Sequence, residues 1–340
     1  MFKARPDTIS EEAEKCKMKN RTSIINYLIA LVMILCLNFI LPRLMPGDPL
    51  LAIYGDEAFI AMTPELKAEL ISRFALDQST GQQFWTYISS LVKGDLGYSY
   101  YYNAPVMAVI LGSLPWTVLL VGLAISISTL IGVVLGMESG YRRGRPLDRA
   151  LLGSVMFASG FPDFFVGILL LLFFGVVLGL VPLAGAVTPY AGYSGLTFLT
   201  DLFKHLALPL TALVMVRIAD PFLLTRNAMV ISLGEPFIFT ARAKGCSDKV
   251  IRYRHAGKNS LLPVVTATGM QLPHMVTRAL FIEIVFSYPG VGSLLYNALL
   301  TRDYPLLQGI LLVLTVTVLL VNLLVDIVYT RLDPRIAYAY

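Results

Sequence analysis

Residues 235–263, EPFIFTARAKGCSDKVIRYRHAGKNSLLP, form a basic, helix-forming stretch between two strongly apolar segments. Pro236 can occupy the first turn of a helix, where its missing N–H costs nothing, and Gly245 is well placed to end that helix. A second short helix can begin with Ser247 as its N-cap and stop near Gly257. The stretch, here named the knob, therefore predicts a helix, a tight turn and a second helix.

The charge of the knob indicates that it contacts another molecule. Asp248 is the one acid near its basic residues. These are Arg242, Lys244, Lys249, Arg252, Arg254 and Lys258.

Composition places the chain in the membrane class. Of its 340 residues, 56% are hydrophobic and only 14% are charged, and the mean hydropathy is +0.71. These values lie far from those of a soluble domain. The net charge of +5 therefore needs a membrane explanation first, because excess Lys and Arg gather in cytoplasmic loops.

Apolar runs predict an all-α integral membrane protein with six spans. We expect them at 23–44, 114–137, 150–181, 206–225, 263–286 and 306–330. The third exceeds one straight span and contains Pro162, so it should be tilted or kinked there. A cleaved signal peptide is the competing reading of the first run, but its core is long and no A-x-A site follows.

The segment 45–113 is mixed in composition and predicts a small extracytoplasmic subdomain of short helices. Thr63 should cap a helix that begins at Pro64. Tyr98 and the tyrosines at 100–102 could form an interfacial belt, a docking face or the core of this subdomain, and we favour belt or packing. The rest, 114–340, is expected to form the core membrane domain with the second to sixth spans, and residues 227–262 its cytoplasmic loop.

The distribution of basic residues orients the chain. Nineteen of the 27 Lys and Arg residues fall in the tail 1–22, the loop 139–149, the segment 226–262 and the C-terminus from 331 on, whereas five fall on the opposite side. The excess places the knob and both termini in the cytoplasm.

Charges inside predicted spans are expensive unless they face protein or water. Arg217 and Asp220 are three residues apart and could pair on one helix face, whereas Arg278 and Glu283 should find partners on other helices. For Arg217, Asp220 and Glu283 a translocation path and interhelical packing are both open. Asp163 reads as a satisfied residue at the kink, and Asp326 as a hydrated residue near the cytoplasm.

Catalytic motifs find little support in the sequence. No G-x-x-x-x-G-K-[ST] occurs, so the chain should not hydrolyse nucleotide itself. His205, His255 and His274 lie in different segments without metal-ligand spacing, and the three cysteines read as incidental. We therefore expect a transporter subunit that is energised by another chain.

Several motifs resemble one family of transport proteins. Residues 240–266, TARAKGCSDKVIRYRHAGKNSLLPVVT, resemble the cytoplasmic coupling loop of ABC importer permeases of the dipeptide, oligopeptide and nickel family. The segments 286–309 and 321–336 are similar to its last external loop and C-terminal end. MPGDP at 45–49 and GDLGYSY at 94–100 resemble the first permease of the heterodimeric pair. The resemblance covers nearly the whole chain.

The resemblance implies a type I importer fold and a set of partners. These are a second homologous permease, two cytoplasmic ATPase subunits, an extracytoplasmic substrate-binding protein and the lipid bilayer of a prokaryotic plasma membrane. ATP and Mg would be bound by the ATPase subunits, and this chain would hold no cofactor.

The resemblance also implies that the knob seats in a cleft of the ATPase. Small residues would allow close approach, and basic residues would offer charge. The implied coupling residues are Ala241, Arg242, Ala243, Lys244, Gly245, Arg254 and His255. Gly257-Lys258 departs from the family, which more often has Leu-Arg, and Gly257 could loosen the second helix.

Peptides are the leading substrate. Nickel or metal chelates come next, and an opine or a sugar oligomer is possible. An ion-coupled secondary transporter is the alternative from another class, although no inverted repeat is visible. A nucleic-acid reading of the basic helices leaves too little surface between spans, whereas lipid headgroups could bind them as a side effect.

Overall fold

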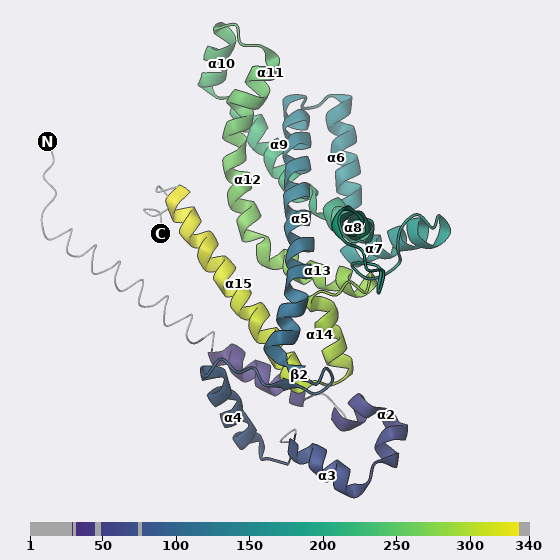
Figure 1. The fold of residues 1–340 in the computed structure, drawn as a ribbon. Helices are drawn as coiled ribbons and strands as arrows, with labels where there is room; N and C mark the ends of the chain where they lie inside the picture. Colours follow the sequence, from purple (N-terminus) through teal and green to yellow (C-terminus); the bar gives the residue numbers. More distant parts are fainter. Residues whose placement is uncertain (1–28, 30–31, 45–48, 74–76, 333–340) are drawn as a thin grey trace, which may run out of the picture. The chain divides into compact units, whose positions relative to one another are not determined.

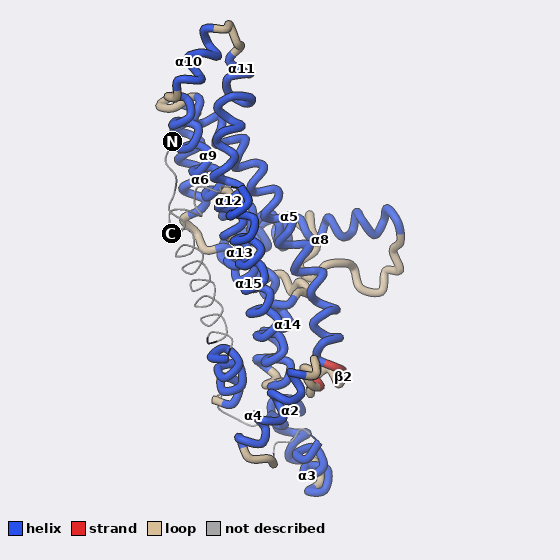
Figure 2. Tube along the Cα trace, turned by 90° about the vertical axis from the view of Figure 1, so that its left-hand side faces the viewer, coloured by secondary structure: helices blue, strands red, loops and turns tan. Residues whose placement is uncertain are grey.

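The structure, a computed structural model, describes residue 29 and residues 32–44, 49–73 and 77–332. The chain divides into two compact units, Met1–Met107 with Ala298–Leu314 and Ala108–Asn297 with Thr315–Tyr340. Figures 1 and 2 show that the described part is mostly helical, with one small hairpin and connecting loops, the longest between η1 and α8. The expected all-α class is thus confirmed for the described residues.

Short helices build the first unit. Its elements are a helix at Val32–Arg43, α2 (Pro49–Ala61), α3 (Pro64–Arg73), α4 (Thr80–Val92), the antiparallel strands β1 (Tyr98–Ser99) and β2 (Ala104–Pro105), and the start of α15 (Tyr304–Leu332). As predicted, Thr63 caps α3, because its Oγ1 accepts the N–H of Leu66 at 3.3 Å. At α4, Ser79 and Gln82 form a reciprocal capping box.

Asp303 ties the hairpin to α15 within this unit. Its side chain is fully buried, and its Oδ2 accepts hydrogen bonds from the hydroxyl of Ser99 at 2.5 Å and the N–H of Tyr101 at 3.0 Å. Its Oδ1 accepts the N–H of Leu306 at 3.2 Å, in the first turn of α15. The hairpin tyrosines Tyr98 and Tyr101 remain 44% and 52% exposed, so they are not the core of this unit.

The second unit is formed by long helices and the knob. Its elements are most of α5 (Val106–Tyr141), α6 (Pro146–Ser159), α7 (Asp163–Leu170), the π-helix η1 (Leu171–Val177), α8 (Gly195–Arg217), α9 (Ala219–Leu233), α10 (Pro236–Ala243), α11 (Asp248–Val250), the π-helix η2 (Ile251–Gly257), α12 (Lys258–Met270), α13 (Leu272–Val285) and most of α14 (Val291–Leu300). The main core joins α5, α7, α8 and α13 through residues such as Leu120, Val166, Leu213 and Ile282.

The helices refine the predicted spans. Among the described residues, three helices are long and apolar enough to cross a membrane, Val106–Tyr141, Gly195–Leu233 and Tyr304–Val321, and a fourth candidate is the pair α6 and α7–η1. That pair is bent by 94° between Ser159 and Asp163, which confirms the predicted break near Pro162.

Other predicted boundaries shift. The span expected at 206–225 starts at Gly195 and runs to Leu233, and the span expected at 263–286 is divided between α12 and α13. The tail 1–22, the start of the first span and the PGD part of the PGDP motif lie outside the described residues, as does the side chain of Asp326.

A glycine stripe brings α5 and α9 into backbone contact. Gly132, Gly136 and Gly140 are spaced four residues apart, so they lie on one face of α5. A Cβ atom on Gly136 would lie 2.7 Å from the backbone oxygen of Phe222, and one on Gly140 would lie 2.8 Å from that of Arg226. Small residues at this spacing are the usual means of close helix packing in membranes.

We expect Gly136→Ala to destabilise the protein by about 1–3 kcal/mol, because the added methyl group overpacks the α5–α9 contact. Gly122→Ala is the matched control: it makes the same change on the same helix, at a position with no atom within 4 Å of the new Cβ. Thermal unfolding in detergent compares the two. Equal melting temperatures for the two variants would contradict the close contact.

Candidate functional site

The knob lies at one end of the second unit, and Figures 1 and 2 show α10 and α11 at the free end of α9 and α12. Its first helix begins as predicted, with Glu235 extended at the N-cap and Pro236 at the first helical position. Gly245 follows the C-cap Lys244 with φ at +75°, a conformation that favours glycine.

Gly245 closes α10 with a Schellman motif. The N–H of Cys246 donates to the carbonyl of Ala241 at 3.2 Å, and the N–H of Gly245 donates to that of Arg242 at 2.9 Å. Cys246 packs against the small core of the knob, in keeping with the apolar contact that often accompanies this motif. The predicted tight turn at Gly245 is confirmed.

The expectation that the second helix stops near Gly257 is wrong. Ser247 has the extended backbone of an N-cap but makes no side-chain cap, and α11 passes directly into η2 and then α12. Gly257 itself is helical, with φ −61° and ψ −44°. The knob is therefore connected to α12 by continuous helix on this side.

Close packing explains the glycine at this position. A Cβ on Gly257 would lie 3.0 Å from the sulfur of Met137 on α5 and 2.6 Å from the carbonyl oxygen of Arg252. Residues Ile251–Gly257 form the π-helix η2, and its i→i+5 pairing brings the Arg252 carbonyl close to Gly257. The expected loosening of the helix by Gly257 stays a prediction.

The predicted coupling residues divide into buried and exposed sets. Met229 of α9 packs with Ile238, Ile251 and Ala256 of the knob, and together they form a small core. Ala241 is only 5% exposed, so its small side chain serves packing within the chain rather than contact with a partner.

The outward face combines positive charge with aromatic surface. Phe239 is 61% exposed and Phe237 is 36% exposed. Among the predicted coupling residues, Arg242, Ala243, Lys244, Gly245 and Arg254 are exposed, and His255 is half-buried. The basic members of this set form no ion pair within the described part of the chain. Unpaired charge beside exposed Phe is the composition of a docking surface.

Glu138 anchors η2 to the end of α5. Its Oε1 accepts hydrogen bonds from Arg252 Nη1 at 2.6 Å and from the hydroxyl of Tyr253. The bond to this carboxylate raises the pKa of the Tyr253 hydroxyl. The Arg252 guanidinium also lies 4.3 Å from the ring centroid of Tyr141. Arg252 is thus used internally and differs from the free basic residues around it.

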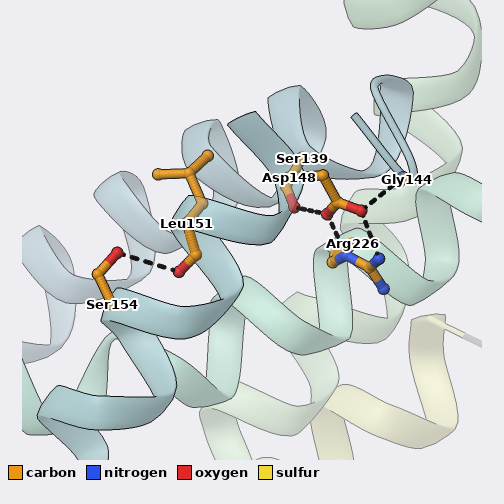
Figure 3. A network of polar contacts seen from close by, with 6 residues as sticks. All are labelled: Ser139, Gly144, Asp148, Leu151, Ser154 and Arg226. Carbon is orange, nitrogen blue, oxygen red and sulfur yellow. Dashed lines mark hydrogen bonds and ion pairs between the residues drawn. The ribbon is translucent and has the colours of Figure 1, made fainter. Parts of the chain in front are cut away.

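A second ionic network, drawn in Figure 3, joins α9 to the start of α6. Arg226 donates from Nε to Asp148 Oδ1 at 2.7 Å and from Nη2 to Oδ2 at 2.8 Å. The Ser139 hydroxyl and the Gly144 N–H donate to the same carboxylate. This bidentate pair fixes the α5–α6 hairpin against α9. Sequence reasoning missed it, because Arg226 and Asp148 are 78 residues apart.

Arg217 is buried without the predicted partner. It is 1% exposed, and its Nη1 donates to the hydroxyls of Ser128 at 2.9 Å and Thr129 at 3.2 Å on α5. Asp220 is exposed and forms no ion pair among the described residues. The i,i+3 spacing crosses the junction of α8 and α9 at Ile218, so the two side chains do not pair as they would on one helix.

Glu283 anchors the turn that leads into α14. It is fully buried, and its carboxylate accepts hydrogen bonds from the hydroxyl of Thr117 at 2.7 Å and from the N–H of Gly292 at 2.6 Å. A Cβ on Gly290 would lie 2.3 Å from its carboxyl carbon. An acid at a helix N-terminus is favourable, so these contacts favour the packing role over the path. A path role for Arg217, Asp220 or Glu283 stays a prediction.

Within the described residues, no three His, Cys, Asp or Glu side chains are grouped to hold a metal ion.

The chain belongs to the family of binding-protein-dependent transport system inner membrane components, whose profile matches residues 128–338. It is a permease subunit of an ABC importer, located in the inner membrane.

Similar proteins cover nearly the whole chain. It is 36% identical over 313 residues to a putative peptide permease protein of Brucella suis, with 91% of this chain and 96% of that protein covered. It is 32% identical over 319 residues to the dipeptide transport system permease protein DppB of Escherichia coli, with 89% and 93% covered.

A solved structure confirms the fold. The MetNI methionine ABC transporter, in an inward-facing conformation, has a chain that matches with a TM-score of 0.52 and 16% identity. The match covers 67% of this chain and 97% of the other. It supports the expected fold of the importer permeases.

We expect a double-mutant cycle of Asp148→Asn and Arg226→Gln to show a coupling free energy of about 0.5–3 kcal/mol, because each single change leaves the partner unpaired. Arg145→Gln, which alters an exposed arginine at the N-cap of α6 that forms no ion pair with the described residues, is the control and should change stability little. Chemical denaturation in detergent gives the free energies. Additive effects of Asp148→Asn and Arg226→Gln would contradict the clamp.

Proposed function

We propose that this permease forms half of the translocation path of a peptide importer. The observation that carries the proposal is its similarity, over about nine-tenths of the chain, to proteins named as peptide and dipeptide permeases. The other half would be a second, homologous permease. Two cytoplasmic ATPase subunits would bind ATP and Mg, and this chain would hold no cofactor.

The proposed topology has six spans with both termini in the cytoplasm. The excess of Lys and Arg at the knob, the α5–α6 loop and the two ends of the chain supports this orientation. The segment 45–113 would then lie outside, and the knob would face the ATPase.

The knob is proposed to transmit closure of the ATPase to the spans. Three features support this role: exposed Phe237 and Phe239 beside unpaired basic residues, a rigid Schellman turn at Gly245, and continuous helix from α11 into α12. A partner that moves α11 would also move α12, because α11, η2 and α12 follow one another with no loop between them.

Nickel or metal-chelate import by the same family is the alternative substrate class. An ion-coupled transporter is the alternative from another class, and it is disfavoured by the family to which the chain belongs. Vanadate separates the energy sources, because it should block uptake that depends on an ATPase and leave ion-coupled uptake intact.

We predict that Gly245→Arg leaves the protein inserted but uncouples ATP hydrolysis from uptake, since it places a strained, bulky residue on the docking face. Gly144→Arg is the matched control, because Gly144 has a similar φ of +79° and equally open surroundings but lies on the α5–α6 loop. Proteoliposomes with the ATPase subunits and binding protein report both activities. Normal uptake by Gly245→Arg would refute the coupling role.

Docking of the binding protein gives a further prediction. Photo-cross-linkers at Tyr101 and Tyr296, both exposed, should capture it, whereas one at Phe239 should capture the ATPase. The reverse pattern would show that the orientation is wrong. Mass spectrometry of the small molecule bound to the captured binding protein then tests the substrate: a peptide supports the proposal, and a metal chelate favours the alternative.

A further inference from the structure

The bend between α6 and α7 places an acid at the start of a broken span. Pro162 occupies the N-cap of α7 and Asp163 its first turn. Broken helices expose backbone polar groups, and membrane proteins tolerate them where they line a cavity or pack inside protein. Discontinuous helices of this kind often carry substrate sites in transporters.

Asp163 is paired loosely with an arginine of another helix. Its Oδ2 lies 3.8 Å from Nε of Arg278 on α13, and its Oδ1 is buried without a hydrogen-bond partner in the described part of the chain. The Asp148–Arg226 pair of the same unit has two bonds of 2.7 and 2.8 Å and further donors. A carboxylate that serves only packing would be satisfied in the way that Asp148 is.

The pair borders a cavity of about 230 Å³. Its lining consists of Pro162, Asp163, Phe164, Thr277, Arg278 and Phe281. The two Phe side chains are 44% and 55% exposed, and the Arg278 side chain is 40% exposed. The cavity is smaller than the roughly 300–1,000 Å³ of pockets that enclose drug-sized ligands, so it fits one end of a larger molecule.

Contact with lipid does not account for this pair. Both residues fall within predicted spans, where ionisable side chains face a bundle interior, a partner or water. Two other intramembrane charges have different roles, since Glu283 holds the turn before α14 and Arg217 donates to hydroxyls on α5. Asp163 thus keeps an unpaired, buried oxygen, Oδ1, and the residue lines an open, partly aromatic cavity.

We propose that Asp163, oriented by Arg278, accepts the ammonium group of a substrate that passes through the permease. This inference rests on the proposed peptide import. Every unmodified peptide carries an amino terminus, so such an acceptor recognises peptides without regard to their sequence. Phe164 and Phe281 add apolar and cation–π surface around the same group.

Direct binding tests the inference without the binding protein. Isothermal titration of trialanine into the purified permease–ATPase complex should give an affinity at least about tenfold lower for Asp163→Asn than for wild type, because a charged hydrogen bond is lost. N-acetyl-trialanine should bind both weakly and equally. Asp163→Glu, which keeps the carboxylate, should regain part of the affinity, and Asp77→Asn, at an exposed acid of the first unit, should match wild type.

The outcomes separate recognition from packing. If wild type binds trialanine and N-acetyl-trialanine equally, or if Asp163→Asn keeps the wild-type preference, the inference is wrong. Asp163→Asn could also lower only the yield or melting temperature of the complex, while the remaining complex still prefers trialanine over N-acetyl-trialanine. That result would likewise assign the pair to packing. Tight binding of N-acetyl-Ala-Ala-Lys would support ammonium recognition and show that a side chain can supply the group.

Uptake tests the proposed function separately. Wild-type proteoliposomes with binding protein and ATP that take up no peptide would refute peptide import, whatever the titration shows. If peptides are taken up, Asp163→Asn should slow trialanine uptake while the binding protein still stimulates ATP hydrolysis, since docking and coupling lie elsewhere on the chain.

Discussion

The backbone contact between α5 and α9 is the constraint on which the second unit depends. Because Gly132, Gly136 and Gly140 lack side chains, the two helices approach closely along three successive turns. This approach brings Arg226 of α9 beside Asp148 and fixes the α5–α6 hairpin. The same end of α5 supplies Glu138 and Met137, which hold η2. The position of the knob thus follows from three missing side chains in the last turns of α5.

Local signals in the sequence predicted local structure well. Pro236, Gly245 and Thr63 act where capping and turn chemistry place them, and the break near Pro162 follows from proline geometry and excess length. Features that depend on distant pairing could not be predicted in this way. Asp148 with Arg226, and Glu138 with Arg252, become visible only when helices far apart in sequence lie together.

The role of a glycine depends on contacts that the sequence does not show. Gly257 suggests a helix end by residue type, yet it lies inside a helix. The position is a glycine because Met137 leaves no room for a side chain. Gly290 and Gly292 lie beside the carboxylate of Glu283, where a Cβ atom would leave it no space. The four-residue spacing of the α5 stripe was a readable signal for close helix packing, and it was the one signal that could have located the α5–α9 contact.

The π-helix η2 has a consequence for how the knob can move. A π turn holds about one residue more than an α turn, so converting η2 to α-helix would shift the register of everything beyond it by about one residue. One residue corresponds to about 100° around a helix axis. A change from π to α pairing in η2 would therefore turn the knob about the helix axis without bending the helix.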